Sequence, residues 1–265
     1  MNLKSNSLVN FSSAAPPPGS EAERALLACI SPERLSTYQV SAQTRHCSPL
    51  ELYLWDRDLA SACMGDVALL EIALRNSCDR QLSKLSQKIG NTPDWYMGTL
   101  PFDDRSLACI RVAWKHLTAA QRQNHPHGHM IASLTFGFWQ NLFDQGGFIH
   151  HGYPDQRKAD YEEDFWRKGL NKVFPGGRRT TLENNKQWTR TYALNTIKSV
   201  HILRNRIAHH EPLIQGIPIP GEQRRMTLDE VFDSCVILTK LLDSRLSDWF
   251  LNNSKMQMML AEEPQ

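Results

Sequence analysis

The sequence lacks the short motifs by which many enzymes are identified. Its 265 residues contain no G-x-x-x-x-G-K-[ST] phosphate loop and no G-x-S-x-G nucleophile turn. A zincin-type H-E-x-x-H motif is also missing, because His210-Glu211 continues with Pro-Leu-Ile. The sequence therefore gives no indication of a P-loop nucleotide hydrolase, a serine hydrolase or a zincin.

Long apolar runs are absent as well. No stretch of about 18 uncharged apolar residues occurs, so the sequence predicts no membrane span. Residues 1–20 contain one lysine and no apolar run of about seven residues, which is unlike a secretory leader or an anchor. This segment is rich in Ser, Asn, Ala and Pro, and we expect it to be a disordered tail.

The six cysteines are scattered and form no C-x-x-C pair. The simplest interpretation is that they are buried thiols in a reducing cytoplasm, so we expect a cytoplasmic protein. Three histidines lie close together in His125-Pro-His127-Gly-His129. No cysteine or carboxylate lies nearby at a suitable spacing, and Pro and Gly indicate a loop, so we predict no metal site there.

Alternating strand patterns are missing too, and the apolar residues recur at steps of three and four. The sequence therefore predicts an all-α bundle. We expect one helical domain over residues 21–252, followed by a flexible tail over 253–265. The main predicted helices are Pro49–Lys84, Asp103–Ala120, Met130–Phe143, Thr181–His210 and Thr227–Leu251.

Charge is nearly balanced over the whole chain, with a formal net charge of +2. It is not evenly distributed, because residues 165–210 hold ten Lys and Arg against one acid, Glu183. Such a segment predicts contact with nucleic acid, although a solvated surface with its acids nearby in space would give the same pattern. The residues that we predict to bind RNA are Arg178, Arg179, Lys186, Arg190, Lys198 and Arg206.

The basic segment ends in the most informative stretch of the chain, Leu203–Pro212. It places an arginine, an amide and two imidazoles within seven residues, Arg204 to His210. Arginine suits phosphate oxygens, and histidine transfers protons near neutral pH. RNA carries its own nucleophile, the 2′-OH, so these residue types suffice to cleave RNA without a metal or a cofactor.

This stretch matches the R-N-x-x-x-H signature of HEPN ribonucleases, with Arg204, Asn205 and His209 in the motif positions. His210 also fits the looser R-x(4–6)-H form. From about Glu33 to Leu242 the chain resembles the Abi-like (abortive infection, AbiD/AbiF) branch of HEPN proteins. The blocks that carry the resemblance are Arg34-Leu35-x-x-Tyr38, Leu52-Tyr53-Leu54-Trp55-Asp56, Leu70–Asn76, Ser133–Trp139 and the Arg204 segment.

The resemblance implies a HEPN-type helical bundle with additional helices, and a metal-independent endoribonuclease acting as a toxin in phage defence. It implies Arg204, Asn205 and His209 as the catalytic set, a homodimer that brings two motifs together, and a small structured antitoxin RNA as a possible partner. We expect His210 to lie beside the catalytic set or to be exposed, without taking part in the reaction itself. A non-catalytic RNA-binding or interaction module is the alternative interpretation.

An internal echo of the motif occurs at Leu74-Arg75-Asn76, where Asp79, Arg80 and Gln81 occupy the positions that would carry histidine. This first copy of the motif therefore has no histidine that could transfer a proton. Arg75 is either a relic of duplication or an arginine that braces the site through Glu71. A salt bridge at the end of a helix is the interpretation that we favour.

Overall fold

The computed structural model describes residues 16–98 and 100–264, so most of the expected tail at 1–20 lies outside the described residues. The fold is all-α, as predicted. The α-helices are α1 (Glu21–Cys29), α2 (Pro32–Arg45), α3 (Pro49–Gly90), α4 (Asp104–His116), α5 (Ala119–Gln123), α6 (Pro126–Ser133), α7 (Phe136–Asn141), α8 (Gly177–Glu183), α9 (Arg190–Ala208), α10 (Leu228–Leu242), α11 (Ser244–Asn253) and α12 (Lys255–Ala261). Shorter helical turns are η1 (Trp95–Met97), η2 (Glu162–Trp166) and η3 (Leu170–Val173). Two small antiparallel hairpins pair β1 (Phe148–Ile149) with β2 (Arg157–Lys158), and β3 (Ile217–Pro218) with β4 (Arg225–Met226).

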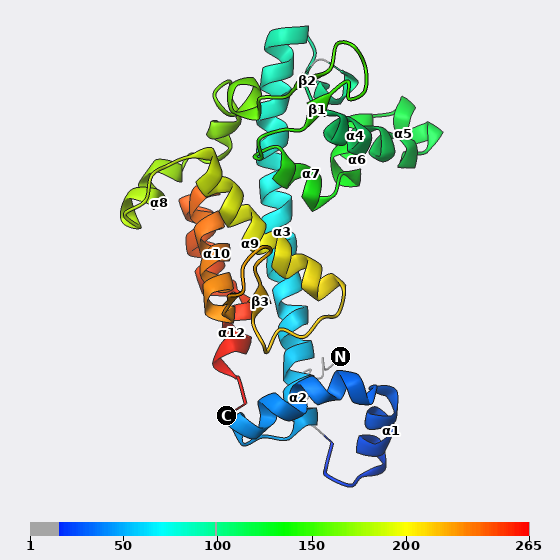
Figure 1. Ribbon diagram of the computed structural model, residues 1–265, viewed down its shortest axis with the longest axis vertical. Helices are drawn as coiled ribbons and strands as arrows, with labels where there is room; N and C mark the ends of the chain where they lie inside the picture. Colours follow the sequence, from blue (N-terminus) through cyan, green and yellow to red (C-terminus); the bar gives the residue numbers. More distant parts are fainter. Residues whose placement is uncertain (1–15, 99, 265) are drawn as a thin grey trace, which may run out of the picture.

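The 42-residue helix α3 is the axis of the molecule (Figure 1). Ser48 caps it by accepting a 3.0 Å hydrogen bond from the backbone of Glu51, and Pro49 occupies the first turn. Buried apolar residues at helical spacing keep one side of α3 in the core along most of its length. It ends at Gly90, six residues beyond the predicted end at Lys84, and the next residue, Asn91, caps it with a left-handed φ of +56°.

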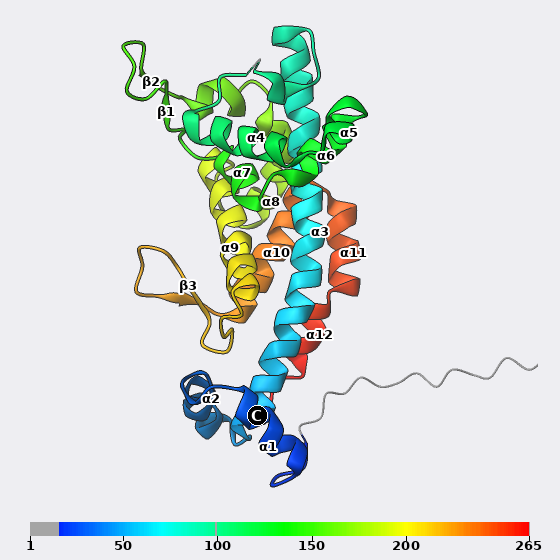
Figure 2. The ribbon, with the colours of Figure 1, turned by 90° about the vertical axis from the view of Figure 1, so that its right-hand side faces the viewer.

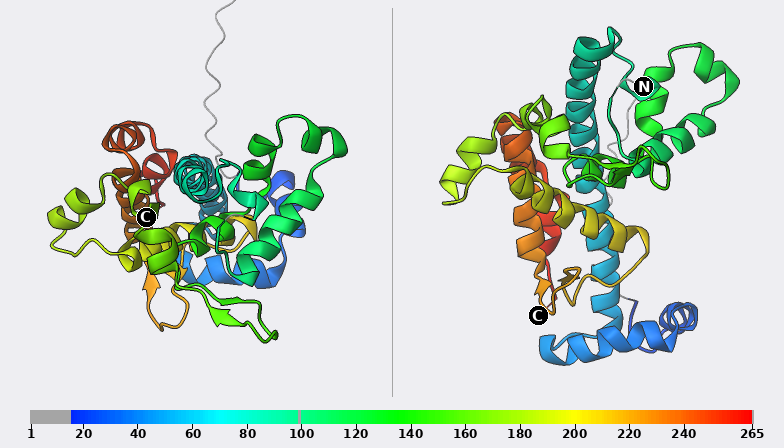
Figure 3. Two further views of the ribbon diagram at one scale, coloured as in Figure 1. Left: turned by 90° about the horizontal axis from the view of Figure 1, so that it is seen from above. Right: turned by 45° about the horizontal axis from the view of Figure 1, so that its top comes forward.

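Other helices pack along α3 in two groups. Helices α9, α10 and α12 lie beside its N-terminal two thirds, and α4 to α7 cover its C-terminal part (Figures 1 and 2). Viewed from above, α3 stands among these helices near the centre of the molecule, and α2 crosses its first turns (Figure 3). One continuous apolar core links both groups.

The prediction of one continuous helix over Thr181–His210 is wrong for the first third of that segment. The structure has two helices there, α8 and α9, and Thr189 rather than Thr181 caps the second by accepting a 3.1 Å hydrogen bond from Tyr192 N. Asn185 adopts a left-handed φ of +52°, which turns the chain between the two helices. The break lets Trp188 fold back over Gly177, where an added Cβ would lie 2.4 Å from the indole.

Two other predicted helices are also interrupted. The run Met130–Phe143 is divided between α6 and α7 by extended backbone at Leu134 and Thr135. The last predicted helix divides at Asp243, an extended residue that accepts a 2.8 Å hydrogen bond from Arg245 N and so starts α11. Thr227, the predicted N-cap of this last helix, is confirmed as the cap of α10 and forms a capping box with Glu230.

The expectation of a flexible tail at 253–265 is wrong for most of that segment. Residues Lys255–Ala261 form α12 against α3, and Met256 is fully buried. Asp66 of α3 accepts hydrogen bonds from Ser254 Oγ (2.6 Å) and Met256 N (2.9 Å). Trp55 Nε1 donates to the carbonyl of Met259 at 3.0 Å. This segment is therefore held in place by residues that are far from it in the sequence.

Candidate active site at the end of α9

The Arg204 motif occupies the last turn of α9, which ends at Ala208, before the two histidines rather than just after them as predicted. The backbone N–H of His209 donates to Asn205 O at 3.0 Å, so helical geometry persists to that residue. His210 then adopts a left-handed φ of +54°, and Glu211 N closes the end by donating to Arg206 O at 2.9 Å. The two histidines therefore leave the helix in different directions.

Arg204 faces α3. Its Nε lies 3.9 Å from Oε2 of Glu71, and both side chains are partly exposed. Glu71, which the sequence suggested as a bracing partner for Arg75, lies beside Arg204 instead. Arg75 differs from the interpretation that we favoured, because it lies in the middle of α3 and makes no ion pair within the described residues, where its buried Nε has no hydrogen-bond partner.

Asn205 and His209 face another side of α9. They line an open groove of about 250 Å³ together with the loop around β3, which contributes Pro218, Ile219 and Pro220. Their spacing of four residues explains why they share this face. Arg204 is not among the residues that line the groove. Within one chain, the structure therefore pairs Asn205 with His209 but turns Arg204 away from them, as expected for a five-residue separation on an undistorted helix.

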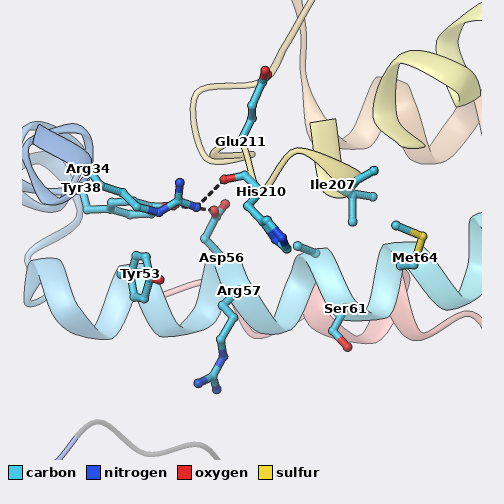
Figure 4. A pocket seen from close by; sticks show the side chains of 12 residues that line it. Arg34, Tyr38, Tyr53, Asp56, Arg57, Ser61, Met64, Ile207, His210 and Glu211 are labelled. Carbon is cyan, nitrogen blue, oxygen red and sulfur yellow. Dashed lines mark hydrogen bonds between the residues drawn. The ribbon is translucent and has the colours of Figure 1, made fainter. Parts of the chain in front are cut away.

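His210 lines a third surface, an open pocket of about 600 Å³ between α2, α3 and the end of α9 (Figure 4). Arg34 of α2 donates a hydrogen bond to the carbonyl of His210. Its guanidinium also lies over the ring of Tyr53, 5.9 Å from the centroid. The first block of the family resemblance thus contacts the last one directly.

A buried hydrogen-bond network fixes the loop that follows the motif. Tyr38 Oη donates to Asp56 Oδ2 at 2.7 Å, and Asp56 Oδ1 accepts from the backbone of Leu213 (3.0 Å) and Ile214 (2.9 Å). Burial raises the pKa of Asp56, against these hydrogen bonds and the charge of Arg34, which lower it. Burial and the neighbouring carboxylate also raise the pKa of Tyr38, so its hydroxyl remains a donor. Asp56 thereby joins α2 and α3 to the end of α9.

Sequence reasoning missed His201, which precedes Arg204 by three residues and lies beside it on the helix. Its Nδ1 lies 2.8 Å from Gln140 Oε1, and its ring stacks on Phe136 with centroids 4.8 Å apart. Burial, and then the charge of Arg204, lower the pKa of His201, so it is neutral at physiological pH. Because the amide oxygen requires a donor, Nδ1 carries the proton and Nε2 retains its lone pair. The i, i+3 spacing was the signal that could have revealed it.

The predicted RNA-binding residues divide into two groups. Arg178, Arg179, Lys186 and Lys198 are exposed. Two predictions are wrong, because the side chains of Arg190 and Arg206 are only 12% exposed and bind within the protein. Arg190 donates to Glu162 and to the carbonyl of Phe143. Arg206 pairs with Glu211 and donates to the carbonyl of Pro212, so its role is to hold the end of α9.

The histidine cluster is not the predicted loop, because residues 126–133 form α6. His127 Nε2 lies 3.0 Å from Asp79 Oδ1, and its Nδ1 lies 3.3 Å from Asp94 Oδ1. Both carboxylates are far from His127 in the sequence, one on α3 and one in the turn after it, so the spacing of residues could not predict these contacts. Within residues 16–98 and 100–264 no group of three or more His, Cys, Asp or Glu has the arrangement of a metal site, and no helix is long and apolar enough to cross a bilayer.

A comparison of the chain with protein-family models finds no match, and comparisons with curated proteins and with solved structures find none either. The resemblance to HEPN proteins therefore stays a prediction from the sequence motifs.

Proposed function

We propose that this protein is a HEPN-type endoribonuclease of the Abi-like kind, which cleaves RNA through the 2′-OH and needs no metal. The observation that carries the proposal is the accessibility of the motif at the end of α9. Arg204 is 38% exposed and only loosely paired, and His209 is exposed beside Asn205 in an open groove. Arg206, in the same turn, is committed to internal contacts, whereas Arg204 makes none closer than 3.9 Å with an acid among the described residues.

In this reaction one imidazole removes the proton of the 2′-OH, whose oxygen forms a bond to the adjacent phosphorus. The bond from phosphorus to the 5′-oxygen breaks, and a second imidazole protonates that oxygen. The products are a 2′,3′-cyclic phosphate and a 5′-OH. Arg204 stabilises the charge that builds on the phosphoryl oxygens, and Asn205 orients His209 or the phosphate.

A second copy of the chain completes the site in this proposal. In one chain Arg204 and His209 lie on different sides of α9, and His209 is the one exposed imidazole of the groove that it shares with Asn205. Two copies with their motifs facing one another would place the Arg204 of one beside the His209 of the other. His201 and His210 are the imidazoles that could make a single chain self-sufficient. We further propose a toxin of abortive infection in the cytoplasm, with RNA as substrate and a structured RNA as antitoxin.

The separation of Arg204 from His209 also favours one alternative, an RNA-binding module without turnover. Incubating the purified protein with total RNA in EDTA, beside a His209→Ala control, distinguishes the two. We expect wild type to produce fragments with cyclic-phosphate and 5′-OH ends and the variant to produce almost none. Intact RNA in both samples would support the binding module. Activity that is lost in EDTA and restored by Mg²⁺ would contradict the metal-independent mechanism.

A further inference from the structure

Two neighbouring hollows beside η3 are lined by cations. One, of about 510 Å³, lies between the last turns of α3 and η3, and four lysines line it: Lys84, Lys88, Lys168 and Lys172. The other, of about 420 Å³, is lined by Lys172 and Arg178 together with aromatic rings. Lys172 belongs to both, so the hollows adjoin. We name these five cations the basic track. Within the part of the chain that the structure describes, no Asp or Glu lines either hollow.

The charges of the basic track are largely uncompensated. Of its five cations, only Lys168 forms an ion pair among the described residues, with Asp164 at 3.4 Å. Lys84 and Lys88 lie near the C-terminus of α3, where positive charge also complements the helix dipole. The dipole does not account for Lys172 and Arg178, which lie beyond α3. A row of unpaired cations in a concave surface is suited to a polyanion.

One end of the basic track has aromatic walls. The ring of Trp188 is partly exposed and lies 5.4 Å from Trp166 and 5.7 Å from Phe174, measured between centroids. Its other support is Gly177, where any side chain would collide with the indole. The break between α8 and α9 therefore places a rigid indole beside Arg178 and Lys172. Cations that follow a backbone, next to an aromatic ring on which a base stacks, are typical of sites for single-stranded nucleic acid.

We propose that the basic track binds single-stranded RNA, with its phosphates along the lysines and a base against Trp188. This inference rests on the proposed function, because it names how the substrate docks. The basic track adjoins Trp188, two residues before the start of α9, and the motif lies at the other end of that helix. The 19 residues of α9 span roughly 28 Å at 1.5 Å per residue. The RNA would thus be held at a distance from the bond that is cleaved.

The test measures binding without cleavage. A labelled, unstructured oligoribonucleotide is titrated by fluorescence anisotropy over a salt series, with His209→Ala in every protein. One protein also carries Lys84→Gln, Lys88→Gln and Lys172→Gln. Its matched control carries Lys115→Gln, Lys158→Gln and Lys255→Gln, three exposed lysines elsewhere on the molecule. The two proteins have the same net charge.

Each phosphate contact with a single strand contributes roughly 0.7 to the slope of log K against log salt, so the loss of three contacts should flatten this slope by about 2. Binding at low salt should weaken by at least about tenfold. The control should match the parent. Equal losses in both proteins would show a general effect of charge and overturn the proposal, as would unchanged binding in the basic-track protein.

The indole is tested with Trp188→Leu and Trp188→Phe, and thermal unfolding shows which of them remain folded. Inorganic polyphosphate, which has no bases, is the second probe. Trp188→Leu should weaken RNA binding roughly 5- to 150-fold, the equivalent of one base stack, while leaving polyphosphate binding unchanged. Trp188→Phe should retain most of the RNA affinity. RNA affinity that is unchanged in folded Trp188→Leu, or an acidic peptide that competes as well as RNA does, would overturn the proposal.

Cleavage by protein with an intact His209 separates this proposal from the proposed function. If RNA is cleaved with cyclic-phosphate ends but binds independently of the basic track, only the docking proposal fails. If RNA binds through the basic track and no RNA is cleaved, only the nuclease proposal fails.

Discussion

Tyr38 and Asp56, which are 18 residues apart and on different helices, meet in the core through a 2.7 Å hydrogen bond. Asp56 is 4% exposed and also accepts hydrogen bonds from the loop that follows the motif helix. A residue that joins α2 to α3 therefore also holds the loop that follows α9.

Removing this hydrogen bond should destabilise the protein. We expect Tyr38→Phe to lower the free energy of unfolding by about 1–3 kcal/mol, because it leaves a buried carboxylate with one partner fewer. Chemical denaturation measures the change. Tyr53→Phe is the matched control, since that hydroxyl has no hydrogen-bond partner among the described residues. Equal effects of the two substitutions would contradict a special role for the Tyr38–Asp56 pair.

Neighbouring arginines of the motif helix should have opposite roles. Arg204→Ala should reduce kcat by about 10²–10³, as loss of a group that stabilises transition-state charge does. Its loose contact with Glu71 is partly exposed, so the free energy of unfolding should change by less than about 1 kcal/mol.

Arg206→Ala should do the reverse, because its guanidinium holds the end of the helix. The loss of these contacts should lower stability by about 1–3 kcal/mol, with a smaller effect on kcat. Cleavage rates and denaturation curves of the two variants, measured side by side, check both expectations. A reversed pattern would mean that Arg204 is structural.

The two histidines at the end of α9 should also differ. We expect His209→Ala to reduce cleavage by about 10²–10⁴, the usual contribution of general acid–base catalysis. His210→Ala should reduce it less, because His210 faces the pocket of Arg34 rather than the groove of Asn205. Initial rates on one RNA substrate measure both. A larger loss for His210→Ala would move the catalytic site into that pocket.

A composite site makes a prediction about mixed oligomers. Wild type combined with an excess of His209→Ala protein should lose activity per wild-type chain as the subunits exchange, because each site would combine residues of two copies. Activity proportional to wild-type chains, together with a monomeric mass in solution, would instead indicate a self-contained site that uses His201 or His210.

His127 should make stability depend on pH. Burial lowers the pKa of His127, but hydrogen bonds and charges from Asp79 and Asp94 outweigh burial and raise it. Its contribution is therefore fully present below the unfolded pKa of about 6.5 and is lost as the pH rises through the folded pKa. The stability difference between wild type and His127→Gln should shrink from about pH 6 to pH 9. A difference that stays constant over this range would contradict a charged pair between His127 and the two carboxylates.

Several elements could be predicted from local sequence alone. Ser48 and Pro49 mark the start of α3, apolar residues at helical spacing continue it, and Thr227 starts α10 with its capping box. Pro212 bars the motif helix from extending past its histidines, although the helix already ends at Ala208. These features depend on hydrogen bonds and steric limits within a few residues, so the local sequence contains their cause.

Features that depend on distant partners could not be predicted in this way. Residues 253–265 look like a tail until Asp66 of α3 accepts their hydrogen bonds, and Arg190 looks like a free cation until Glu162 meets it. Trp188 interrupts a helical pattern because Gly177 gives its ring a surface on which to pack.

The sequence by itself determined the helical class, the starts of α3, α4 and α10 and the residues of the candidate motif. Only the tertiary structure decided which cations remain unpaired, that Arg204 and His209 face different sides of α9, and that Arg34 and Asp56 hold the end of that helix. The reason is physical: helix caps depend on hydrogen bonds between neighbours along the chain, whereas the burial and pairing of a charge depend on residues that the fold brings from elsewhere.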